Sequence, residues 1–71
     1  MRYLIIIENA GTNYSAYCPD LPGCIAIGDT IEETKQNMRE ALAFHLEGMI
    51  EDGEPIPQPS DAEWVDVAVA S

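Results

Sequence analysis

The first thirty residues alternate between short apolar runs and turn residues, which predicts three strands joined by tight turns. Apolar and aromatic side chains dominate residues 3–7, 14–18 and 24–27, and β-branched and aromatic residues favour strands. The Asn and Gly residues between the first two runs suit the positive φ angles of tight turns. Pro19 and Pro22 cannot donate a ladder hydrogen bond, so they end the second strand. Because the connections are short, we expect an antiparallel meander.

The apolar period then changes to three and four residues, which predicts one amphipathic helix. Thr30 followed by Glu33 forms a capping box, so Thr30 is the expected N-cap. Gly53 suits the first position after the helix. The helix therefore covers about 21 residues. Its apolar stripe consists of Ile31, Met38, Ala41, Leu42, His45, Leu46 and Met49.

Three prolines follow the helix, at positions 55, 57 and 59, and they favour an extended connector. Residues 64–69 contain a tryptophan and three valines in partial alternation, so we expect a fourth strand beside the first. Trp64 is expected to share the core with the helix. The pattern predicts an α+β fold of order βββαβ, an antiparallel sheet with one helix on one face, in a single domain over residues 1–71.

Charge narrows the function classes. The chain has 13 acidic and 3 basic residues and a net charge of -10, which repels phosphate backbones and disfavours direct nucleic-acid binding. Eleven of the acids follow Gly28, so this half is expected to attract a basic partner. No apolar run approaches the ~20 residues of a membrane span. We expect a cytoplasmic protein without membrane contact, whose two cysteines are free thiols.

The stretch from Tyr14 to Thr30 resembles the signature of the HicB-like antitoxins of bacterial toxin–antitoxin systems. The resemblance is carried by Tyr14, Ala16, Pro19 to Cys24, and Gly28 to Thr30. It continues with Asn37, Ala41, Asp52, Gly53, Ile56, Pro57 and Pro59. The matching positions extend over nearly the whole chain.

The resemblance implies a partial RNase H-like fold and an oligomer. It also implies an antitoxin that binds and silences a small HicA-like RNA-cleaving toxin. Many members of the family continue into a C-terminal DNA-binding domain, whereas this sequence ends at Ser71. We therefore expect a short form that does not bind DNA alone.

Two groups of residues are candidates for contacts. Residues 4–7 are apolar at every position, and successive side chains of a strand point to opposite faces of the sheet. Every second side chain therefore packs under the helix, and the others need another apolar surface to cover them. The expected oligomer interface, in a homodimer or homotetramer, is Leu4, Ile5, Ile6 and Ile7. The expected contacts to a toxin are Tyr17, Asp20, Leu21, Glu40, Glu47 and Asp66.

Catalytic and metal chemistry have little support in the sequence. Cys18, Cys24 and His45 are the typical metal ligands, fewer than the four that a structural site wants, so no cofactor or metal is expected. The cysteines are interpreted as core residues, with a cross-strand disulfide as an alternative. A metal-dependent RNase H-like nuclease would use Glu8, Asp66 and either Glu33 or Glu40. A further alternative is a solitary oligomeric scaffold or small-ligand binder. We predict a binding module that is not an enzyme.

Overall fold

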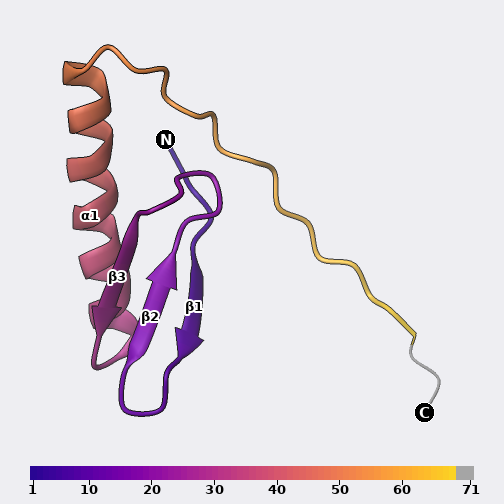
Figure 1. Cartoon of the computed structure of the whole chain (residues 1–71). Helices are drawn as coiled ribbons and strands as arrows, with labels where there is room; N and C mark the ends of the chain where they lie inside the picture. Colours follow the sequence, from indigo (N-terminus) through magenta and orange to yellow (C-terminus); the bar gives the residue numbers. More distant parts are fainter. Residues whose placement is uncertain (69–71) are drawn as a thin grey trace.

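The computed structural model describes residues 1–68 and contains three strands followed by one helix (Figure 1). The strands are β1 (Ile6–Asn9), β2 (Tyr14–Tyr17) and β3 (Ile25–Gly28), and the helix is α1 (Ile31–Glu51). They form one antiparallel sheet in the order β1-β2-β3. The predicted α+β class, a meander followed by a helix, is confirmed.

β1 begins three residues later than the sequence pattern predicts. Its first residue, Ile6, lies opposite Tyr17, which is the last residue of β2. Pro19 follows shortly afterwards and lacks the N–H that further pairing needs. Residues 3–5 therefore extend past the end of their neighbour strand. Tyr3 instead donates a hydrogen bond of 2.6 Å from its hydroxyl to the carbonyl oxygen of Pro57.

α1 begins and ends where its capping residues predict. The Thr30 side chain accepts a 3.0 Å hydrogen bond from the backbone N–H of Glu33. At the other end Gly53 has a φ of 71°, and the N–H of Glu54 donates to the carbonyl of Met49 at 2.9 Å. This is the Schellman arrangement that satisfies the last carbonyl groups of a helix. Within residues 1–68, no helix is long and apolar enough to cross a membrane.

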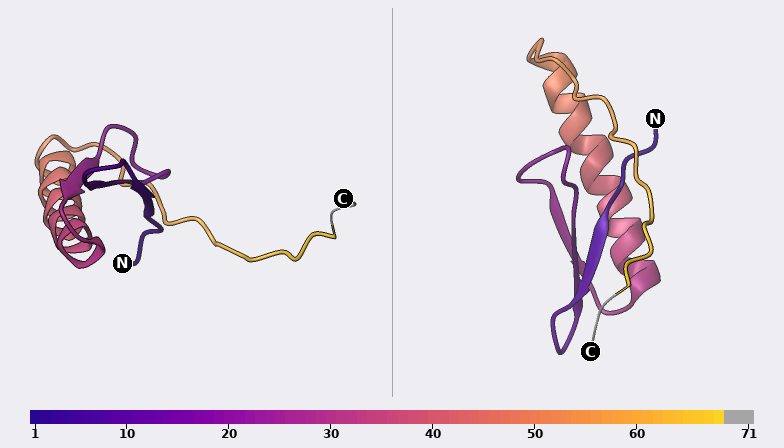
Figure 2. Two further views of the ribbon diagram at one scale, coloured as in Figure 1. Left: turned by 90° about the horizontal axis from the view of Figure 1, so that it is seen from below. Right: turned by 90° about the vertical axis from the view of Figure 1, so that its right-hand side faces the viewer.

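α1 covers one face of the sheet, mainly over β2 and β3 (Figure 2). The side-chain amide of Asn37 donates to the carbonyl of Ile27 at 2.8 Å, which ties the middle of α1 to β3. The buried apolar side chains between the layers are Ala16, Cys18, Leu21, Cys24 and Met38. This core is small, as expected for a chain of this length.

The predicted fourth strand is wrong for residues 64–68, which have no regular structure; Val69 lies outside the described residues. Trp64 is 101% exposed, so the prediction that it shares the core is also wrong. A strand requires a neighbour, and this segment leaves the sheet after Ser60, which is bound to Asp20 (Figure 1). The RNase H-like relation needs that strand and stays a prediction.

Candidate protein-binding surfaces

The solvent-facing side of α1 presents an aromatic side chain among carboxylates. Phe44 is 80% exposed. Glu40 precedes it by four residues, Glu47 follows it by three and Glu51 by seven, and residues at these spacings are neighbours on a helix surface. We call Glu40, Phe44, Glu47 and Glu51 the acidic helix face.

The position of Phe44 follows from the packing of α1. Leu42 packs against the core, and two residues further on the helix has turned by about 200°, so Phe44 points to the opposite side. Within residues 1–68 the single ion pair joins Lys35 and Glu32 at 3.9 Å. Among the described residues, the carboxylates of the acidic helix face are therefore not paired with a basic side chain.

A second apolar surface lies on the side of the sheet that α1 leaves open. Ile6, Tyr17 and Ile25 stand opposite one another across the three strands, and Ile27 follows on the same side of β3. Ile25 and Ile27 are 65% and 57% exposed. We call Ile6, Tyr17, Ile25 and Ile27 the open sheet face.

The predicted oligomer interface is divided between the two sides of the sheet. Ile5 and Ile7 pack against the core under α1. Ile6 belongs to the open sheet face, and Leu4 precedes β1 with 44% of its surface exposed. This is the expected arrangement, in which every second residue of the stretch packs under the helix. The residues between them remain available for a contact.

The predicted toxin-binding residues do not form one surface. Glu40 and Glu47 share the acidic helix face. Tyr17 belongs to the open sheet face, on another side of the molecule. Asp66 lies in the exposed segment after Ser60. These residues were selected from the sequence, which does not say which of them the fold brings together.

Asp20 and Leu21 have structural roles in this fold. Leu21 is 1% exposed, so it offers no surface to a partner and is removed from the proposed contacts. Asp20 accepts hydrogen bonds from the hydroxyl and the backbone N–H of Ser60, at 2.5 and 3.0 Å. The hydroxyl has the larger effect, and both bonds hold the pKa of the Asp20 carboxyl below its ordinary value of 3.8.

The cysteines and the carboxylates lie apart in the part of the chain that the structure describes. Cys18 and Cys24 are buried free thiols, and burial, followed by the nearness of Cys18, raises the pKa of Cys24. No three His, Cys, Asp or Glu residues between positions 1 and 68 are placed to hold a metal. Asp66, which the nuclease alternative requires, lies on the segment that leaves the sheet.

Sequence reasoning missed Phe44, Ile25 and Ile27. The helix stripe was identified by its regular apolar positions, and Phe44 lies outside that stripe. This off-stripe position was itself a signal, because a large aromatic residue on the polar side of a helix exposes area that a partner can bury. The alternation of isoleucines with Ala26 was the equivalent signal in β3.

Similar proteins agree with this geometry. A Haemophilus phage HP1 protein of 14.9 kDa is 44% identical over 63 residues, which are 89% of this chain and 47% of the phage protein. A chain of the HicA3 and HicB3 toxin-antitoxin complex is 32% identical, with a TM-score of 0.67, over 82% of this chain and 72% of its own. The N-terminal domain of Burkholderia pseudomallei antitoxin HicB is 34% identical, with a TM-score of 0.69, over 80% of this chain and 68% of its own.

The match to one family extends over almost all of the sequence. The chain spans about half the length of the phage relative, so the match concerns the shared domain. Residues 3–69 match the family described as the HicB-like antitoxin of bacterial toxin–antitoxin systems. The residues of that match include all three strands and α1. The chain belongs to the HicB-like antitoxin family.

Proposed function

We propose that this protein is an antitoxin that binds a small, basic, HicA-like RNA-cleaving toxin and silences it by covering its surface. Family membership and the similarity to a chain of a toxin–antitoxin complex support this role. The observation that carries the proposal is the acidic helix face, where Phe44 is 80% exposed among three glutamates.

The two kinds of side chain on this face serve different parts of binding. Exposed aromatic residues at the centre of a contact contribute much of the affinity once a partner excludes water from them. The surrounding carboxylates attract a basic partner and speed the encounter. Three carboxylates, those of Glu40, Glu47 and Glu51, surround Phe44 on one side of the helix. A toxin that binds there contacts the carboxylates and the aromatic ring together.

The test is an RNA-cleavage assay with the purified toxin encoded by the neighbouring reading frame. We expect the antitoxin to stop cleavage at a stoichiometric ratio. Phe44→Ala is expected to weaken toxin binding by at least about 2 kcal/mol, about thirtyfold in Kd, as for an interface hot spot.

Tyr17→Ala is the matched control, because it removes an aromatic side chain from the open sheet face. It is expected to leave neutralisation unchanged. Loss of neutralisation in Tyr17→Ala with full activity of Phe44→Ala would place the toxin on the sheet and contradict the proposed surface. The antitoxin alone, with Mg²⁺, is expected to leave the RNA intact, since we propose no catalysis of its own.

The remaining properties of the module are part of the same proposal. It is a single domain that self-associates, binds no nucleic acid directly and works in the cytoplasm, a reducing compartment that suits two free thiols. The open sheet face supports self-association, because an exposed apolar patch of this kind marks a contact. The same patch favours the second candidate function, an oligomeric scaffold without a toxin, if no neighbouring toxin is encoded.

A further inference from the structure

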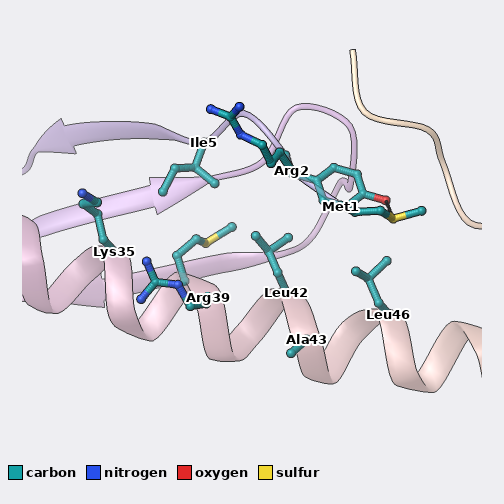
Figure 3. Close-up of a pocket in the computed structure, with 10 residues that line it drawn as sticks. Met1, Arg2, Ile5, Lys35, Arg39, Leu42, Ala43 and Leu46 are labelled. Carbon is teal, nitrogen blue, oxygen red and sulfur yellow. Dashed lines mark hydrogen bonds between the residues drawn. The ribbon is translucent and has the colours of Figure 1, made fainter. Parts of the chain in front are cut away.

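All three basic side chains of this acidic protein line one groove. The groove has a volume of about 580 Å³ and lies between α1 and the chain segment before β1. Lys35 and Arg39 come from α1, and Arg2 comes from the opposite wall (Figure 3). The chain has 3 basic residues in total, so its positive charge is concentrated at this one place.

The floor of the groove is apolar. Ile5 from the sheet side and Leu42 and Leu46 from α1 face the space (Figure 3). The groove exists because α1 packs mainly over β2 and β3, which leaves the start of the chain without a full cover. A ligand for it must therefore combine apolar side chains with negative charge.

Residues 61–67 have that composition. We call them the C-terminal arm. Every residue of the arm is exposed, and Trp64, Val65 and Val67 are 101%, 78% and 74% exposed. The arm also carries three carboxylates, Asp61 and Glu63 before Trp64 and Asp66 between the two valines. The arm thus brings negative charge and large apolar side chains to an apolar floor and to the positive charge of Arg2 and Arg39, while Lys35 already pairs with Glu32 of its own helix.

The C-terminal arm starts beside the groove but then leaves the sheet and the helix of its own chain. Ser60 is fixed by Asp20, and residues 59–62 share a neighbouring hollow with Arg2 and Tyr3. Beyond that point the arm diverges from the sheet and the helix, as Figure 1 and the left view of Figure 2 show. Its seven residues extend over about 23 Å, a length that reaches well beyond its own chain.

We propose that the groove binds the C-terminal arm of a second copy of this chain, in a reciprocal exchange. A two-fold contact of this kind lets each copy offer one arm and one groove, so both exposed apolar surfaces are buried at once. Each copy contributes seven arm residues and ten groove residues, which makes an interface smaller than the ~20–30 residues a side of the standard size. The exchange concerns self-association and does not depend on toxin binding.

The test uses Trp64, which is the one tryptophan of the chain. Its fluorescence is expected to shift to shorter wavelength as the protein concentration rises through the micromolar range, while light scattering reports a dimer. Arg39→Glu is expected to weaken the dimer about tenfold, because it places a like charge against the acidic arm. Glu47→Lys, an equally exposed charge reversal on the other side of α1, is the control and leaves the dimer unchanged.

Mixing two variants distinguishes the exchange of C-terminal arms from other modes of self-association. Arg39→Glu keeps its arm and loses its groove, whereas Trp64→Ala keeps its groove and contains no tryptophan. Adding the second to the first is expected to shift the fluorescence, because that arm enters the intact groove of the other chain. Circular dichroism checks that both variants are folded.

Three results would overturn the exchange. One is no shift on mixing although the unaltered protein shifts with concentration. Another is a concentration-independent short-wavelength emission from a monomer, which means that the arm folds onto its own chain. The third is a monomer with an exposed tryptophan at ~100 μM, a concentration at which micromolar association is populated.

Discussion

At the scale of single residues, Gly28 marks a tight contact between the sheet and the helix. It is the last residue of β3, and a β-carbon there would lie 2.6 Å from Thr34 Oγ1 and 2.7 Å from the Thr34 backbone nitrogen. The nitrogen belongs to the first turn of α1 and cannot move without shifting the helix start. Gly48, inside α1, has open space around the same atom position.

The same substitution at these two glycines is expected to have opposite effects. Gly28→Ala should lower the free energy of unfolding by about 1–3 kcal/mol, because it overpacks the contact. Gly48→Ala should raise the free energy by up to about 1 kcal/mol, because alanine is the better helix former. Urea unfolding of both variants at one protein concentration measures the two values. A Gly28→Ala variant as stable as the unaltered protein would show that the contact at Gly28 is not tight.

At the scale of elements, the sequence best predicts the features that are determined by residues close together along the chain. Both ends of α1 are predicted correctly, because Thr30 and Gly53 are capping residues that act locally. The start of β1 is missed, because it depends on where β2 ends. The apolar residues after position 63 indicate that this segment is buried against another surface. The sequence does not say whether that surface belongs to the same chain or to another.

The candidate surface was predicted in part for a related reason. Glu40 and Glu47 could be selected because acidic residues attract a basic partner. Their partner in the face, Phe44, was missed although its position outside the apolar stripe of the predicted helix was a signal. The groove was not predicted either, because Arg2 is far in sequence from the two basic residues of α1.

The connector after α1 is held at its end by a titratable contact. Ser60→Ala removes the hydroxyl that is the largest cause of the lowered pKa of Asp20, so the pKa of this carboxyl should rise towards 3.8. NMR titration of the side chain measures the change, and Ser15→Ala in β2 is the control. Because the pKa in the fold is lowered, the contact stabilises the connector above the ordinary pKa and is lost as the pH falls through the lowered value. An unchanged pKa would show that Ser60 does not bind Asp20.

At the scale of the whole molecule, charge divides the surface into regions with different partners. The acidic helix face is suited to a basic protein, and the groove with Arg2, Lys35 and Arg39 is suited to an acidic segment. A small core makes a chain of this size marginal alone, so contacts on both regions add buried area. The two regions lie on different sides of α1, so the proposed self-association and the proposed toxin binding do not compete for one surface.

The measurement that tests the central claim most directly is an NMR titration of the ¹⁵N-labelled protein with the unlabelled toxin. We expect the largest shifts of backbone amides in the second half of α1, around Phe44, Glu47 and Glu51. We expect small shifts in β1 and β3. Largest shifts on Ile6, Ile25 and their neighbours, with α1 unaffected, would contradict the assignment of the acidic helix face as the toxin-binding surface.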